Sequence, residues 1–194
     1  MKTVRRVALT CLLATALACA LSAQTYVFQL DPQQSRVAFT LGDVLHTVHG
    51  TFQVKSGSVN FDTSTGNAGG LIAVDAGSGD SGNKARDRKM HKEILESDKF
   101  SDITFAPQHV RGQILPEGNS QVTIDGLMTL HGQSHPMSIT VPVTVHSRSA
   151  TADLAFVVPY VQWGLKNPST FILKVSENVN IDVHAVGQLQ LSSR

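Results

Sequence analysis

Hydrophobic and polar residues alternate with a period of two through most of the chain after residue 23. In Ser138–Val145, isoleucine or valine stands at every second position, with serine, threonine or proline between them. Neighbouring side chains of a strand point to opposite faces, so this pattern predicts a half-buried β-strand. Pro142 has no amide donor, and we expect an unpaired edge or a bulge there. Further runs of this kind are Tyr26–Leu30, Arg36–Leu41, Thr47–Val54, Ser58–Asp62, Leu71–Val74, Ile103–Val110, Gln121–Leu130, Ala152–Val158 and Ile181–Leu191.

Turn-forming residues separate these runs at close intervals. Many short strands joined by such turns are typical of an antiparallel meander that closes into a barrel or a sandwich. The runs contain neither a strand–helix–strand rhythm nor an internal repeat. The turn signals are Asp31-Pro32, Ser56-Gly57, Thr65-Gly66-Asn67, Glu117-Gly118-Asn119 and His131-Gly132.

One segment interrupts the strand pattern. Residues 84–95 are highly charged and lack glycine and proline, and Met90 and Ile94 stand four positions apart. That spacing gives one narrow apolar stripe on a helix. The polar, glycine-rich residues 77–83 before it offer several N-caps. We therefore predict one helix around residues 83–95, lying across the barrel, before the strands resume near Ile103.

The first 23 residues have the pattern of a secretory signal peptide. Three basic residues precede the uncharged apolar run Val7–Ala20, which ends in small residues. We expect cleavage between Ala20 and Ala23. The chain is thus predicted to comprise a signal peptide (1–23) and one exported domain (24–194), located in the periplasm or secreted.

Both cysteines, Cys11 and Cys19, lie in this leader, so the mature chain is expected to fold without a disulfide. Lipidation of Cys19 is an alternative, although Leu17 stands one place late for that cleavage pattern. The apolar run Val7–Ala20 is shorter than the roughly 20 apolar residues of a membrane span. No later stretch approaches that length, so no transmembrane segment is predicted in the mature chain.

Composition and charge narrow the function classes. The formal net charge is +1, and charged residues make up only 16% of the chain. A nucleic-acid-binding protein would need a basic stripe, which is absent, so no nucleic-acid partner is expected. The abundance of glycine, serine, threonine and valine again favours a β protein.

Residues for catalysis or metal binding are hard to assemble. His46 and His49 would face opposite sides of a strand, so no metal site is predicted from the eight histidines. Asp87 with His91 is a candidate for hydrolysis or metal-dependent chemistry, but no nucleophile motif accompanies them. We therefore expect no enzyme activity and no cofactor.

The apolar face of the strands remains as the candidate functional feature. A barrel of about eight strands either fills its lumen or encloses one small ligand. Small residues predicted to face inward would leave space for a ligand, but they also occur where a sheet bends. On the residues alone, a lipid-holding barrel and a filled structural or interaction barrel stay equally open. The small candidates are Ala38, Ala73, Gly126, Ala185 and Gly187.

Four motifs in order resemble the YceI-like family of exported lipid-binding proteins. The resemblance covers roughly Gln24–Gln190 and departs from the family over Tyr160–Lys166, near the expected mouth of the pocket. Another departure is Lys99-Phe100-Ser101, where the family often has two phenylalanines. The motifs are Tyr26–Phe39 (YVFQLDPQQSRVAF), Gly50-Thr51-Phe52, Arg86-Asp87 followed by Met90, Leu95, Phe100 and Ile103-Thr104-Phe105, and Gly126–Gly132 (GLMTLHG).

The resemblance implies an elongated, lipocalin-like antiparallel barrel around an apolar channel. The implied ligand is a long apolar lipid, such as a polyisoprenoid, an isoprenoid quinone or a fatty-acid-like chain. Family members are often dimeric, which leaves a homodimer open. Arg86 and Asp87 would either hold the helix against the barrel or meet a head group. The other expected lumen or mouth residues are Phe39, Phe52, Phe105, Met128, Ile139, Val141, Phe156 and Trp163.

Overall fold

A computed structural model describes residues 24–42, 47–170 and 174–192. The expected signal peptide and both cysteines lie outside these residues, as does His46, so cleavage and lipidation stay predictions. The strands are β1 (Thr25–Leu30), β2 (Arg36–Gly42), β3 (Thr47–Phe52), β4 (Val54–Asp62), β5 (Ala68–Asp75), β6 (Asp102–Arg111), β7 (Gly118–Leu130), β8 (Gln133–His146), β9 (Ser149–Val158) and β10 (Val179–Leu191).

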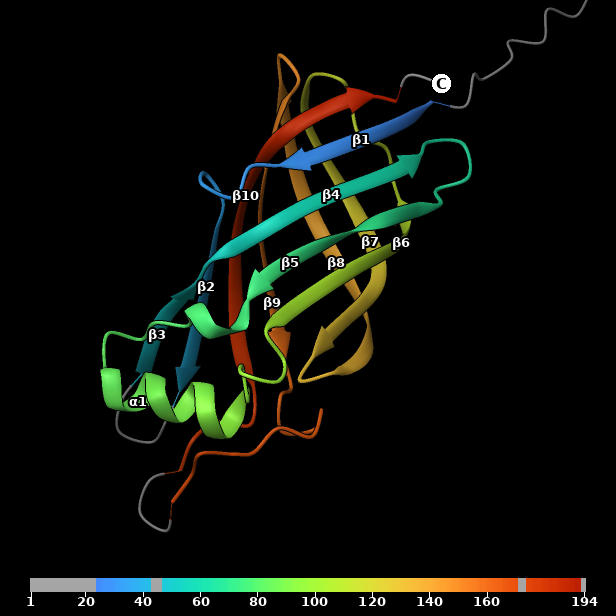
Figure 1. Cartoon of the computed structure of the whole chain (residues 1–194). Coiled ribbons are helices and arrows are strands. Elements are labelled where there is room, and N and C mark those ends of the chain that lie inside the picture. The colour runs from blue at the N-terminus through green and yellow to red at the C-terminus, as the bar shows by residue number, and fades with distance from the viewer. Residues whose placement is uncertain (1–23, 43–46, 171–173, 193–194) are drawn as a thin grey trace, which may run out of the picture.

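The strands form one antiparallel sheet in the order β1-β4-β5-β6-β7-β8-β9-β10-β2-β3. Pairing of β1 with β10 closes eight of them into a barrel, and β2 and β3 extend the wall beside β10 (Figure 1). The prediction of an all-β antiparallel barrel of about eight strands with one inserted helix is confirmed.

One edge of β10 is shared by two strands, which lengthens the barrel. Its segment Gly187–Leu191 pairs with β1, and its segment Asn180–His184 pairs with β2. Between these segments, the amide of Val186 donates to the Ser35 hydroxyl (3.0 Å), and its carbonyl accepts from Ser35 (3.2 Å) and from the amide of Asp31 (2.8 Å). The turn between β1 and β2 therefore satisfies the backbone where neither strand reaches.

The predicted helix forms as α1 (Lys84–Lys89), continued by the π-helical turn η2 (Met90–Ile94). Asn83 caps it by accepting hydrogen bonds from the amides of Ala85 and Arg86. Met90 and Ile94 pack against a core cluster that includes Leu95 and Leu130. The apolar stripe read from the sequence thus faces the barrel, and α1 lies across the end that β2 and β3 form (Figure 1). A short 3-10 helix, η1 (Ala76–Ser78), precedes it.

Pro142 lies on an unpaired edge, as one of the two sequence-based alternatives stated. Strand β8 pairs with β7 over Gln133–Val145 without a bulge, so the other alternative is wrong. It pairs with β9 only over Val143–His146. The edge of β8 that faces β9 therefore lacks a partner at residue 142, where proline has no donor to lose.

The five small residues expected to leave space in the lumen mostly do not do so. Ala38 and Ala73 line no cavity, because the alternate residues of β2 and β5 face inward instead. At Gly126 the ring of Phe105 covers the backbone, and at Gly187 the ring of Phe28 does so. These two glycines therefore make room for aromatic rings, and only Ala185 of the set leaves its space to the lumen.

Gly126 supplies a test of this packing. A Cβ built there would lie 2.5 Å from the carbonyl oxygen of Ala106 and 2.7 Å from Cζ of Phe105. We expect Gly126→Ala to lower the free energy of unfolding by about 1–3 kcal/mol, as overpacking does, in urea denaturation. Gly42→Ala is the matched control, because a Cβ at Gly42 meets nothing within 4 Å. Equal stability of the two variants would contradict the packing described.

Candidate functional site

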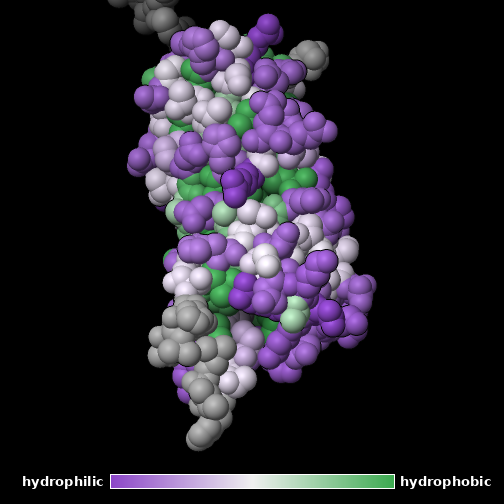
Figure 2. All heavy atoms as spheres, turned by 90° about the vertical axis from the view of Figure 1, so that its left-hand side faces the viewer, coloured by the Kyte–Doolittle hydropathy of each residue, from purple (hydrophilic) through white to green (hydrophobic). Residues whose placement is uncertain are grey.

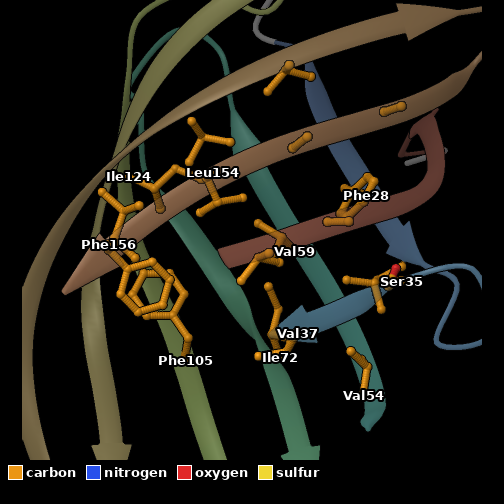
Figure 3. A pocket seen from close by; sticks show the side chains of 18 of the residues that line it. Phe28, Ser35, Val37, Val54, Val59, Ile72, Phe105, Ile124, Leu154 and Phe156 are labelled. Carbon is orange, nitrogen blue, oxygen red and sulfur yellow. The ribbon is translucent and has the colours of Figure 1, made fainter. Parts of the chain in front are cut away.

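The barrel encloses an apolar cavity of about 240 Å³, called here the barrel chamber. Figure 3 shows Phe105 and Phe156 on one side of this space and Phe28 and Val37 on the other. Only Ser35, Thr104 and Thr151 among its lining residues carry a polar side-chain group, and none of the lining residues is charged. Such a lining can contact a hydrocarbon chain but offers almost nothing to a polar head.

A second cavity of about 480 Å³ lies between the barrel end, α1 and the segment that follows β9; we call it the helix chamber. Its wall is also mainly apolar, but it includes Ser81, Arg86 and Lys89 at the helix. On the face in Figure 2 most side chains are hydrophilic, with hydrophobic ones visible at mid-height and in the lower half. The helix chamber thus combines an apolar wall with cationic groups at one place.

The two chambers adjoin. Phe52, Ile103, Met128 and Ile181 line both of them, from the ends or interiors of β3, β6, β7 and β10. We call these four side chains the waist. Any ligand that occupies both chambers must pass the waist, so its side chains can limit the width and length of the occupant.

Eight of the ten site residues expected from the sequence line one chamber or both. Phe52 and Met128 belong to the waist, and Phe39 and Arg86 line the helix chamber. The barrel chamber receives the rest of this group. Asp87 and Trp163 line neither chamber. Ligand contact by any of these residues stays a prediction. The residues of the barrel chamber alone are Phe105, Ile139, Val141 and Phe156.

Asp87 and Arg86 both bind Ser81, in the loop before α1. The carboxylate of Asp87 accepts from the Ser81 amide (2.9 Å) and from its hydroxyl. The guanidinium of Arg86 donates to the same hydroxyl and to the Ser81 carbonyl oxygen, each at 2.8 Å. Asp87 therefore ties the loop before α1 to the helix, and Arg86 does so as well while lining the chamber. The two roles expected for the pair, holding the helix against the barrel or meeting a head group, stay predictions.

The alternative of catalysis by Asp87 and His91 gains no support from this geometry. The hydroxyl next to Asp87 belongs to Ser81, and no hydrogen bond joins His91 to it in the described part of the chain. Nε2 of His91 is buried without a hydrogen-bond partner. The nucleophile–base contact that such chemistry requires is thus missing from this site as it stands.

Trp163 packs outside the chambers. Its ring stacks on His135 of β8, with centroids 4.2 Å apart and planes 2° from parallel. This contact connects the segment after β9 to the free edge of β8. Trp163 therefore holds the segment that borders the helix chamber, rather than lining the chamber itself.

Several residues that line the chambers were not among the expected site residues. They include the aromatic Phe28 and Phe61, the aliphatic Ile103 and Ile181, and the cationic Lys89. A signal for Lys89 existed: it lies three positions after Arg86, on the side of the helix next to Met90. The two phenylalanines also follow the strand period. Their position in the lumen depends on barrel closure, which no local pattern shows.

Tyr160 forms part of the wall of the helix chamber and is 6% exposed. Its hydroxyl donates to the carbonyl oxygen of Ser176 (2.7 Å), which closes the segment between β9 and β10. Burial, with a smaller effect of Glu177, raises the pKa of Tyr160 to about 12. The neutral phenol is therefore favoured in the folded state.

The described residues contain no group of three or more histidine, cysteine or acidic side chains that could bind one metal ion. His49 instead bonds Thr40 through Nδ1 (3.0 Å), and Nε2 of His131 lies 3.8 Å from Glu96. Within the same residues, no helix has the length and hydrophobicity needed to cross a bilayer.

Comparison with protein families gives one match that spans the barrel. The model of the YceI-like domain matches residues 28–187. A UPF0312 protein of Shewanella oneidensis is 30% identical over 123 residues, covering 62% of each chain. One from Vibrio parahaemolyticus is 27% identical over 132 residues, covering 66% of this chain and 68% of that one. The chain thus aligns with about three fifths of the length of the first of these relatives.

Solved structures share the fold at low sequence identity. BcnA of Burkholderia cenocepacia has a TM-score of 0.65 and 17% identity, covering 81% of this chain and 98% of that one. A polyisoprenoid-binding domain from Saccharophagus degradans, implicated in plant cell wall breakdown, also has a TM-score of 0.65, with 13% identity. It covers 84% of this chain and 98% of its own. The departures expected from the sequence over Tyr160–Lys166 therefore leave the fold unchanged.

The raised pKa of Tyr160 predicts a loss of stability in alkali. An unfolded tyrosine ionises near pH 10, whereas the folded one stays neutral up to its pKa of about 12. The unfolded state then binds fewer protons, so stability falls as the pH rises from about 10 to 12. Tyr160→Phe removes this contribution while losing the bond to Ser176 at all pH values.

We therefore expect the variant to be less stable than the parent at pH 7, with the gap in melting temperature narrowing between about pH 10 and 12. Tyr26→Phe is the control, because that hydroxyl donates to Gln24 at the surface. A gap that stays constant, or that narrows equally for both variants, would contradict the assigned environment of Tyr160.

Proposed function

Because this chain belongs to the YceI-like family, we propose that it is an exported binding protein that holds a long apolar ligand in its two chambers. The ligand class is a polyisoprenoid, an isoprenoid quinone or a fatty-acid-like lipid. The observation that supports this most is the barrel chamber, whose lining lacks charge and is almost free of polar side chains.

Physical chemistry favours such an occupant. Each CH₂ group moved from water to an apolar wall contributes about 0.8 kcal/mol, so a long chain can bind without any specific polar contact. An empty apolar cavity loses the contacts that its lining atoms would otherwise make. A chain threaded through the waist would restore those contacts in both chambers at once.

The structural neighbours support the ligand class without establishing it. The domain from Saccharophagus degradans is described as polyisoprenoid-binding, and its fold matches most of this chain. Since the identity is only 13%, the side chains that contact a ligand there need not recur here. The choice among isoprenoid, quinone and fatty chain therefore rests on this protein's own chambers.

Export is the second part of the proposal. It rests on the basic residues and the apolar run of residues 1–23. In an aqueous periplasmic or extracellular space, a long isoprenoid chain is exposed to water unless something covers it. A barrel with an apolar lumen would shield it. The role is non-catalytic binding, in line with a family of binding proteins.

A filled barrel with a purely structural or interaction role is the alternative. The two cavities oppose it, because protein interiors normally contain few voids larger than a water molecule.

Extraction of the purified full chain tests the proposal directly. We expect organic extraction and mass spectrometry to recover a long-chain lipid, or the lipid-free protein to take up a C20 prenol with micromolar affinity or better. Repeated preparations without lipid, combined with no uptake of prenol, quinone or fatty acid, would refute it.

The waist predicts a limit on chain length. Met128 lines both chambers, so Met128→Trp should obstruct the passage between them. In a series of prenols of increasing length, we expect the longest chains to lose affinity at least tenfold while short chains bind as before, since only the long ones need both chambers. Leu127→Trp is the control, because Leu127 neighbours Met128 on β7 but lines neither chamber. Equal loss at all lengths would speak against a threaded ligand.

A further inference from the structure

The charged groups of the two chambers are distributed unevenly. Arg86 and Lys89 are the only charged residues that line the helix chamber, and both are cationic. The barrel chamber is lined by no charged residue at all. The one carboxylate of α1, Asp87, accepts hydrogen bonds from Ser81 and lines neither chamber. One end of the binding space is therefore positive and the other neutral.

Lys89 differs from the lysines whose charge is compensated within the fold. Lys55 pairs with Asp102, Lys99 with Glu96, and Lys166 with Glu93. Lys89 is half-buried at the chamber wall, and it has no ion pair or hydrogen bond in the described ranges 24–42, 47–170 and 174–192. Partial burial of an ammonium group costs free energy unless an acceptor compensates it.

Arg86 is held in place beside it. Two of its guanidinium nitrogens, Nε and one Nη, donate to Ser81, which fixes the plane of the group. The other Nη makes no hydrogen bond within the described residues, although the residue lines the chamber. A guanidinium fixed in this way keeps donors for an oxygen anion at little cost in conformational entropy.

We propose that the helix chamber binds the anionic head group of the ligand, a phosphate or a carboxylate, with Lys89 as the principal contact and Arg86 as a second, fixed donor. This inference rests on the proposed function and adds to it the head-group class and the orientation. The chain passes the waist into the barrel chamber, where no polar head could be accommodated, and the head stays at α1. A charge-assisted bond from a lysine or arginine to such an oxygen is stronger than a neutral one.

The test compares two ligands that differ only in the head. Geranylgeranyl monophosphate and geranylgeraniol have the same chain, so the full-length protein should bind both and prefer the phosphate roughly fivefold at low ionic strength, as one partly exposed ion pair allows. Added salt should reduce the preference, because it screens exposed charges. A C20 fatty acid with its alcohol forms a second pair that distinguishes a carboxylate site from one selective for phosphate. A preference in either pair supports the proposal.

Lys89→Met tests the assigned contact, since methionine preserves most of the aliphatic length without the charge. We expect the variant to lose the preference for the anion and to bind the alcohol as the parent does. Arg88→Met is the matched control, because Arg88 is exposed on the same helix and lines neither chamber. It changes the net charge equally, so it should retain the preference.

The outcomes separate this inference from the proposed function. If the parent binds the alcohol and the anion equally in both pairs, the head-group site is wrong while a lipid-binding role survives. If Arg88→Met abolishes the preference as Lys89→Met does, the effect comes from overall charge and the assigned contact is overturned. If no chain ligand binds, the proposed function itself fails.

Discussion

Closure of the sheet by the pairing of β1 with β10 is the constraint on which the rest of the structure depends. Without it, the inward face of every strand would meet water. With it, alternate side chains of eight strands converge on one enclosed space. Closure leaves a gap in the strand pairing of β10 at Val186, because the pairing with β1 ends at Gly187 and that with β2 ends at His184. The Ser35 hydroxyl accepts from the Val186 amide and donates to the Val186 carbonyl oxygen. The short turn that contains Ser35 therefore allows one edge of β10 to pair with both β1 and β2.

The lumen that results is shaped more by aromatic rings than by the size of its smallest residues. The ring of Phe105 packs on the backbone of Gly126, and the ring of Phe28 packs on the backbone of Gly187. The core consists of two clusters, one within the barrel and one against the helix and the segment after β9, and Phe156 packs against both. The waist, where Phe52 and Met128 face both chambers, lies between them. A binding space and a hydrophobic core are thus built from the same side chains, which links ligand occupancy to stability.

The helix gives this otherwise uniform apolar space a direction. Met90 and Ile94 pack it onto the barrel end, and the bonds of Arg86 and Asp87 to Ser81 hold its preceding loop. Arg86 and Lys89 of α1 line the helix chamber and not the barrel chamber. Because attraction between charges is stronger where water is partly excluded, this asymmetry can orient an amphipathic chain that the apolar walls alone would bind in either direction.

The sequence by itself determined most of the local structure. Alternation located most of the strands, but the chain turns at Gln53, between β3 and β4, whereas the predicted turn at Ser56-Gly57 lies within β4. The break in alternation located the helix, and Met90 with Ile94 identified its inner face. The strand pattern together with the family resemblance also selected Phe39, Phe52, Phe105 and Phe156, which all line a chamber. It misassigned Ala38 and Ala73, whose direct neighbours in β2 and β5 face inward, so that these two alanines face the other way. It also could not separate Asp87 from Arg86.

Only the tertiary structure decided whether the lumen is hollow, which side chains line the waist, and that Trp163 stacks on His135 outside it. These features depend on contacts between residues far apart in the chain. Periodicity specifies the face on which a side chain lies, whereas the neighbour it meets there depends on strand order, register and closure.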